Sequence, residues 1–233
     1  GLSGDIEDTD PQHVGERPKN AVARSPEASR TADIVNKWIA GAREVLKNER
    51  PANMVLLRGL ASLPEIPTMS QAFKLTPAAI AGYPMYRGLA SLVGMEILET
   101  GLTIQDEVNT LKTHFEDYDF LYVHVKETDS CGEDGDCTGK VRVLEEFDSY
   151  VPEILHLEPD VLIVTGDHST PAVLKGHSWH PVPFLIHSRW VRPQGAPGFG
   201  ESMCAQGNLG VFPSLGALPL ALANALKLGK FGA

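Results

Sequence analysis

The stretch VLIVT at positions 161–165, followed directly by GDHSTP at 166–171, gives the clearest indication of fold in this sequence. A short apolar run without polar alternation is typical of a strand that is covered on both faces of a sheet. In α/β proteins, ligands bind beyond the carboxyl ends of such strands. The polar residues after the run therefore indicate a functional site at the end of a buried strand.

On both sides of this stretch, strand patterns alternate with helix patterns along most of the chain. The periodicity predicts strands at 54–57, 96–99, 120–125 and 184–186, and helices at 26–50, 83–93, 103–115, 144–155 and 217–228. Such alternation predicts an α/β fold, with a mostly parallel sheet and helices on both of its faces. Residues 1–25 are polar and show no period, so we expect a loop or the tail of another element there.

Composition excludes several classes of protein. The 233 residues carry 30 acids and 20 bases, a formal net charge of −10, which argues against a nucleic-acid partner. No apolar run approaches the roughly 20 residues of a membrane span, and the first residues do not resemble a signal peptide. Cys131, Cys137 and Cys204 form no Cys-x-x-Cys pair, so we expect a reducing cytoplasm and no disulfide scaffold.

Three polar clusters lie next to predicted strands. Asp129 and Glu133 belong to an acidic loop after the strand at 120–125, and Asp167 and His168 follow the strand at 161–165. His177 lies shortly before the strand at 184–186. Carboxylate and imidazole ligands together favour Mn, Zn or Fe, so the clusters predict a metal site.

Each cluster also has a simpler interpretation. The acidic loop could be a solvated turn, although its spacing does not match a calcium-binding EF-hand. Asp167 and His168 could be a helix cap beside a structural histidine, and His177 could be an ordinary surface residue. Because all three clusters are expected at the edge of one sheet, we favour the metal site.

Three basic residues are candidates for binding an anionic substrate. Lys126 directly follows the strand at 120–125, beside the acidic loop, and is the best placed to contact a phosphate. Arg58 and Arg87 border apolar segments and could act as phosphate clamps, or could simply lie on the surface. His180 is a candidate partner for a metal ligand.

Several motifs resemble one known family. Val164–Pro171 is followed by His177-Ser178 and Pro181–Pro183, and together they resemble the archaeal-type cofactor-independent phosphoglycerate mutases of the alkaline phosphatase superfamily. The resemblance covers nearly the whole chain. It also rests on Gly1–Ser3, Asp8–Pro11, Pro51–Asn53, Leu57–Gly59, Ile80–Gly82, Gly94-Met95, His124–Lys126, Thr128-Asp129, Gly135-Asp136 and Lys140.

The resemblance implies an isomerase that acts on a small phosphorylated substrate in glycolysis and gluconeogenesis. Such enzymes interconvert 2- and 3-phosphoglycerate through a phosphoserine, at a site with two divalent metals, most often Mn and alternatively Zn, Co or Mg. Carried over by motif, Asp167 and His168 would hold one metal, and Asp129 and His177 the other. The physics agrees, because paired cations stabilise an in-line phosphoryl transfer.

Two departures from the family pattern bear on function. Glu133 stands where the family has a metal-binding histidine, and the nucleophilic serine and one Asp ligand are expected upstream, in a segment without a counterpart here. The resemblance thus implies a C-terminal part, with a sheet incomplete on its N-terminal side. Residues 1–25 would be a linker or the end of an inserted substrate-binding domain, and 26–233 would belong to the metal-binding domain.

These departures leave three functional interpretations open. The chain could be part of a mutase completed by an upstream half or a second chain. It could be a non-catalytic metal-binding subunit or a decayed relative. It could also be another phosphotransferase or phosphohydrolase of the same superfamily.

Overall fold

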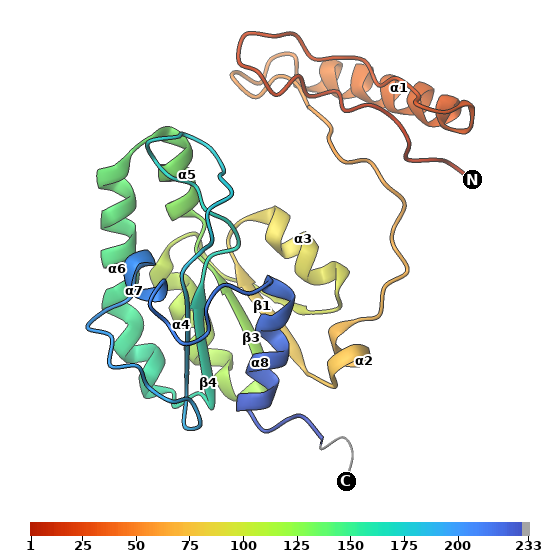
Figure 1. Cartoon of the computed structure of the whole chain (residues 1–233). Coiled ribbons are helices and arrows are strands. Elements are labelled where there is room, and N and C mark those ends of the chain that lie inside the picture. Colours follow the sequence, from red (N-terminus) through yellow and green to blue (C-terminus); the bar gives the residue numbers. More distant parts are fainter. Residues whose placement is uncertain (230–233) are drawn as a thin grey trace. The chain divides into compact units, whose positions relative to one another are not determined.

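The computed structural model describes residues 1–229 and divides the chain into two compact units, residues 1–66 and residues from 67 onward (Figure 1). In the first unit, residues 26–66 pack with the segment that precedes them. Each unit has its own core and is described by itself.

The first unit is built on one helix. After the short turn η1 (Pro26–Ala28), α1 (Ser29–Leu46) buries Ala32, Val35 and Ile39 against Ile6 from the first segment. This confirms the predicted helix, because its apolar residues recur at helical spacing and form one face.

The prediction of a strand at 54–57 is wrong. The segment has no regular secondary structure, and its backbone forms hydrogen bonds with Thr9. The Leu57 N–H donates to Thr9 Oγ1 (2.8 Å), and the Leu57 carbonyl accepts the Thr9 N–H (2.9 Å). The apolar residues Met54, Val55 and Leu57 cover the helix core instead of entering a sheet.

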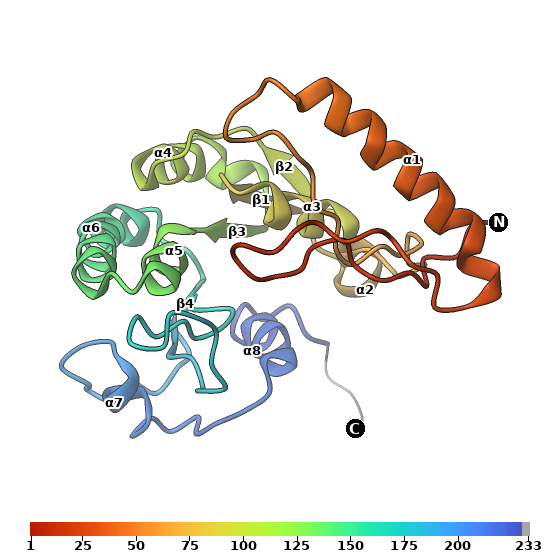
Figure 2. The same cartoon turned by 90° about the horizontal axis from the view of Figure 1, so that it is seen from above.

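The second unit alternates strands and helices, as Figures 1 and 2 show. Its elements in chain order are α2 (Met69–Phe73), β1 (Pro77–Ala81), α3 (Pro84–Leu92), β2 (Glu96–Leu98), α4 (Ile104–His114), η2 (Phe115–Asp117), β3 (Phe120–His124), α5 (Glu127–Asp134), α6 (Cys137–His156), β4 (Val161–Thr165), β5 (Phe184–Ser188), α7 (Glu201–Cys204), η3 (Ser214–Gly216) and α8 (Ala217–Asn224).

The strands form a parallel sheet and an antiparallel pair. In the order β2-β1-β3, Ile80 lies opposite Leu98 and Val123, and all pairs are parallel. This confirms the predicted α/β class. The strand at 184–186 differs from the expectation, because β5 runs antiparallel to β4. Residues 166–183 between them form no helix, and a parallel return normally needs such a crossover.

The central strand β1 was not predicted. It begins with a proline and is mostly alanine, and both residue types are poor strand formers. Its position decides its conformation: Ala78, Ala79, Ile80 and Ala81 are all 0% exposed. Small side chains suit a strand that is paired on both edges and covered on both faces.

Helices cover both faces of the parallel sheet. On one face, Ile80 and Val123 join a core with Val108 of α4 and Ile154 of α6. The other face carries α3 and α8, where Phe120 packs in a cluster with Leu222. The helices expected on both faces are thereby confirmed.

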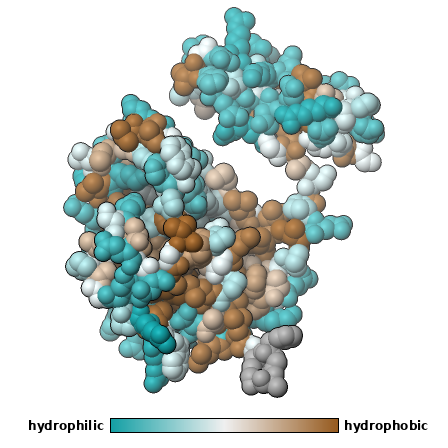
Figure 3. All heavy atoms as spheres, viewed as in Figure 1, coloured by the Kyte–Doolittle hydropathy of each residue, from teal (hydrophilic) through white to brown (hydrophobic). Residues whose placement is uncertain are grey.

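All the strands except β1 lie at an edge of their sheet. β3 ends the three-stranded sheet and β4 ends the two-stranded one, and both are only partly buried although both are apolar. Leu162 of β4 packs on the same core as Leu121 of β3. Apolar residues gather over the strands and α8 in the middle of this unit (Figure 3).

One carboxyl group lies inside the second unit. Glu107 of α4 is 4% exposed; its Oε1 accepts the Gly82 N–H at 3.2 Å, and its Oε2 has no hydrogen-bond partner among the described residues. Burial raises the pKa of Glu107 to about 7, and the charges of Glu127 and Asp106 act in the same direction. The folded state therefore disfavours ionisation of this group.

We predict that Glu107 makes the second unit less stable as the pH rises. Its folded pKa lies above its ordinary value of 4.5, so its stabilising contribution is full below about pH 4.5 and is lost as the pH rises through about 7. Glu107→Gln should therefore remove up to roughly 3 kcal/mol of pH dependence in the free energy of unfolding, measured by urea denaturation at pH 5 and pH 8. Equal pH dependence in parent and variant would contradict the assignment.

Candidate metal centre

The acidic segment that we expected to be a loop is the helix α5. Glu127 and Asp129 lie in its first turn, where the helix dipole favours negative charge. Gly135 ends the helix in the left-handed conformation (φ 76°), which a glycine adopts without strain. Because Asp129 and Glu133 are four residues apart, α5 places both carboxylates on one face.

Close packing brings α5 to the turn after β4. Gly132 of α5 faces Thr170, and a Cβ at this position would lie 2.3 Å from the Thr170 carbonyl oxygen. The Thr170 hydroxyl donates to Asp129 Oδ1, and its carbonyl accepts from Lys140 Nζ at 2.7 Å. Only glycine allows this approach, so Gly132 determines how near Asp129 lies to the histidines.

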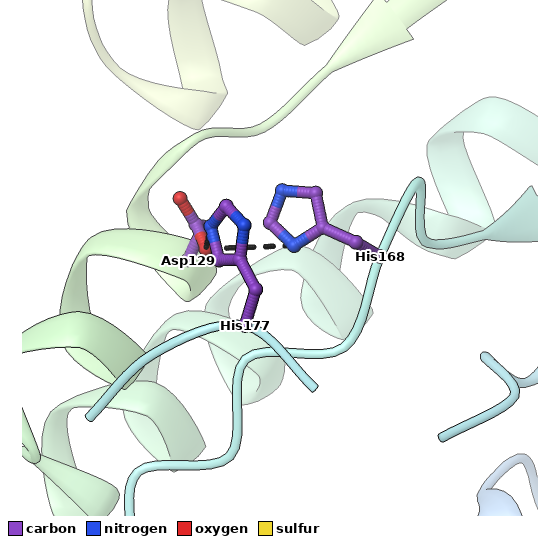
Figure 4. A group of neighbouring side chains, drawn as sticks. All are labelled: Asp129, His168 and His177. Carbon is purple, nitrogen blue, oxygen red and sulfur yellow. Dashed lines mark ion pairs between the residues drawn. The ribbon is translucent and has the colours of Figure 1, made fainter. Parts of the chain in front are cut away.

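Asp129, His168 and His177 converge in the structure. Each offers one ligand atom, and the three atoms lie within 4.8 Å of one another (Figure 4). Asp129 Oδ1 is 3.8 Å from His168 Nδ1 and 3.7 Å from His177 Nε2. An antiparallel bridge between Ser169 and Ser178 places the two histidines side by side.

The other two predicted ligands lie next to this group. Asp167 Oδ2 is 3.5 Å from His168 Nε2, and Glu133 Oε1 is 3.6 Å from His177 Nε2. The structure therefore brings all five predicted metal-binding residues to one place, as two acid–imidazole groups. Asp129 lies near both histidines.

The two most constrained carboxyl groups remain ionised. Burial alone would raise the pKa of Asp129, but hydrogen bonds from Lys126 and Thr170 outweigh it and lower the pKa. Burial of Asp167 is likewise outweighed, chiefly by the Tyr86 hydroxyl, so its pKa is also lowered. Ionised carboxylates are the form that binds a cation.

The predicted substrate-binding residues lie in ion pairs. The Lys126 ammonium binds Asp129 Oδ2, so it lies inside the acidic group rather than open to a ligand. Arg87 pairs with Glu99 (2.7 Å), and Arg58, in the first unit, pairs with Asp10 (3.3 Å). His180 accepts or donates a hydrogen bond at Ser178 Oγ (2.8 Å).

Sequence reasoning missed the residues that hold the ligands in place. Thr170 and Lys140 belonged to motifs that we used only for the family resemblance, and Tyr86 lay within a predicted helix. Tyr86 donates a 2.6 Å hydrogen bond to Asp167 from a position 81 residues away. No local pattern marks such a contact, because it depends on the packing of α3 against the sheet.

The donor set fits a divalent transition metal. Ligands at about 2.1 Å from an ion lie about 3–4 Å from one another, close to the separations found here. The donors are carboxylate oxygens and imidazole nitrogens, which suit Mn and Zn, and no thiol takes part in the group.

A model of the family described as "Metalloenzyme superfamily" matches residues 39–218. The chain belongs to this superfamily. A second model, "2,3-bisphosphoglycerate-independent phosphoglycerate mutase", matches residues 2–53. The superfamily match agrees with the use of a divalent metal.

Curated relatives carry the same mutase name. The chain is 53% identical to a protein of Aquifex aeolicus over 229 residues, and 52% identical to one of Thermotoga maritima. Both are named "Probable 2,3-bisphosphoglycerate-independent phosphoglycerate mutase". The resemblance stated from the sequence is thereby confirmed. The matches cover 98% and 100% of this chain but only 56% and 58% of the relatives, so the chain spans little more than half their length.

Solved structures share the fold. A protein from Pyrococcus horikoshii superposes with a TM-score of 0.80 at 28% identity, over 89% of this chain and 60% of that protein. A cofactor-independent phosphoglycerate mutase from Thermoplasma acidophilum superposes with a TM-score of 0.61 at 23% identity, over 96% and 60%. The second likeness shows the fold alone.

Among residues 1–229, none of the helices has both the length and the apolar composition that crossing a bilayer requires.

We predict that Gly132→Ala weakens the contact that positions Asp129. The new methyl group would collide with the Thr170 carbonyl, and overpacking of this kind costs about 1–3 kcal/mol. The matched control is Gly88→Ala on α3, where nothing lies within 4 Å of the new Cβ and alanine should stabilise the helix by up to about 1 kcal/mol. Urea unfolding of both variants checks the prediction, and equal effects would contradict it.

Proposed function

We propose that this chain supplies one part of the two-metal site of a cofactor-independent phosphoglycerate mutase, which interconverts 2- and 3-phosphoglycerate through a phosphoserine. The observation that carries the proposal is the convergence of Asp129, Asp167, His168 and His177 at one end of the second unit. The 53% identity to the Aquifex aeolicus relative supports the choice of substrate.

The hydrogen bonds of His168 support an assignment of ligands to two ions. The Thr170 hydroxyl gives its proton to Asp129, which can only accept, so the Thr170 oxygen accepts the Nδ1–H of His168 (3.0 Å). The Nε2 lone pair of His168 is then free on the side of Asp167. We assign Asp167 and His168 to one ion, and Asp129, His177 and Glu133 to the other.

This assignment of ligands to two ions suits the transfer of a phosphoryl group. When bound, two divalent cations stabilise the negative charge on a transferring phosphoryl group and lower the pKa of an attacking hydroxyl. The chain's own part is to hold ionised carboxylates and neutral imidazoles in place. Lys126 could contact a phosphate only by exchanging its partner Asp129. Mn is the metal that we expect, with Zn, Co or Mg as alternatives.

Glu133 distinguishes this site from the family pattern. A carboxylate is a harder ligand than the imidazole it replaces, and its charge lowers the net positive charge of the metal pair. This favours Mn or Mg over Zn and weakens the Lewis acidity of the ion. The same change favours a second candidate function, a non-catalytic metal-binding subunit or decayed relative.

The remaining parts of the site would come from the region of the relatives that this chain does not span. We expect the nucleophilic serine and one further Asp ligand there. The unpaired edges of β3 and β4 support this, because an edge strand readily accepts another strand. Residues 1–25 would belong to a linker or an inserted substrate-binding domain.

Two further features bear on the substrate and the compartment. Arg58 and Arg87 could bind phosphate only by exchanging their partners Asp10 and Glu99.

The free thiols of Cys131, Cys137 and Cys204 agree with the reducing cytoplasm, where glycolysis and gluconeogenesis operate.

The test is an assay of 2- to 3-phosphoglycerate conversion with Mn²⁺. The chain is assayed alone, and together with the part of the Aquifex aeolicus relative that it does not match. We expect activity only in the mixture, and a loss of at least about 1000-fold with Asp167→Asn, because a ligand to a catalytic ion is removed. Stable metal binding without mutase activity would favour the non-catalytic candidate. Turnover of other phosphate esters alone would change the substrate class.

We predict that Glu133→His changes the metal preference of the site. An imidazole at this position restores a softer, neutral ligand beside His177, so affinity for Zn²⁺ should rise relative to Mn²⁺, by about tenfold or more. Isothermal titration of both ions with parent and variant measures the ratio. Glu145→His, on the exposed surface of α6, is the matched control. An unchanged ratio would remove Glu133 from the ligand set.

A further inference from the structure

Tyr86 connects the sheet to the candidate metal centre. It lies on α3, is 7% exposed, and donates its hydroxyl proton to Asp167 Oδ2 at 2.6 Å. Neither the family match nor the metal-site motifs mark this residue as a functional group. A buried tyrosine needs a partner for its hydroxyl, and here the partner is a proposed metal ligand.

The ring of Tyr86 is held by a second aromatic residue. His124, the last residue of β3, stacks on it with ring centroids 3.5 Å apart and an angle of 25° between the planes. His124 Nδ1 is buried and has no hydrogen-bond partner among the described residues. The face of the imidazole makes the contact with Tyr86, and it holds the Tyr86 ring against the carboxyl end of a strand.

The two oxygens of Asp167 are held in different ways. Oδ2 accepts from Tyr86, and Oδ1 accepts the backbone N–H of His168 at 3.1 Å. A carboxylate oxygen has two lone pairs, so each oxygen keeps one for a cation. Without Tyr86, the one hydrogen bond left to the carboxylate among the described residues would be that from the His168 backbone, and the Asp167 side chain is 45% exposed.

We propose that Tyr86 is a positioning residue that fixes the Asp167 carboxylate for metal binding, with the His124 ring as its support. This inference rests on the metal site proposed above for Asp167. The contact joins α3 to the turn after β4. Tyr86 would not bind the metal itself but would orient a residue that does, by a hydrogen bond to it.

The first test needs no metal. Tyr86→Phe keeps the ring stacked on His124 and removes only the hydroxyl, and Tyr83→Phe removes the same group from a ring whose centroid lies 6.1 Å away. In metal-free crystal structures we expect one Asp167 conformation in the parent and in Tyr83→Phe. We expect a rotated or multiple Asp167 conformation in Tyr86→Phe. An Asp167 carboxylate that stays in place in Tyr86→Phe overturns the proposal.

The second test measures the consequence by isothermal titration with Mn²⁺. Tyr86→Phe should weaken binding about 10–100-fold, the usual cost of losing an outer partner of a ligand, and Tyr83→Phe should not. In an Asp167→Asn background the Tyr86→Phe loss should disappear, because the two residues act through one contact. Full Mn²⁺ affinity in Tyr86→Phe, or an undiminished loss in the Asn background, contradicts the proposal.

The two tests separate this proposal from the proposed function. A parent chain that binds no Mn²⁺ would reject the metal site. The metal-free crystal structures would still decide whether Tyr86 orients Asp167.

Discussion

The contact between Gly132 and Thr170 is the constraint on which the candidate site depends. It lets the helix after β3 approach the turn after β4 so closely that Thr170 can bond both Asp129 and His168. Segments that are about forty residues apart in sequence thereby share one polar group. A side chain at position 132 would separate them, since the nearest atom it would meet is backbone, which cannot rotate away.

The same contact explains how the acidic group is tolerated. Asp129 is 12% exposed as a side chain and lies among imidazoles, so an uncompensated charge there would be costly. Lys126 and Thr170 compensate it, and the Tyr86 hydroxyl does so for Asp167. These partners also keep the two carboxylates ionised. The carboxylates are therefore already in the form that binds a cation.

Sequence patterns predicted the strands β2, β3, β4 and β5 and indicated the polar residues near their ends as candidates, because apolar runs and the polar residues beside them are local signals. They failed where tertiary packing decides the conformation. The alanine-rich β1 is a strand only because it lies between β2 and β3, and 54–57 is irregular because it packs on α1 and binds Thr9. The roles of Gly132 and Tyr86 could not be predicted either, since their partners are distant in sequence.

Crystals grown with Mn²⁺ and measured at the manganese absorption edge would reveal whether these side chains bind metal. We expect anomalous difference peaks about 2 Å from donor atoms of Asp129 and His177, and of Asp167 and His168. Crystals of the folded chain in which no peak lies among these side chains, with Mn²⁺ in large excess over the protein, would contradict the metal centre.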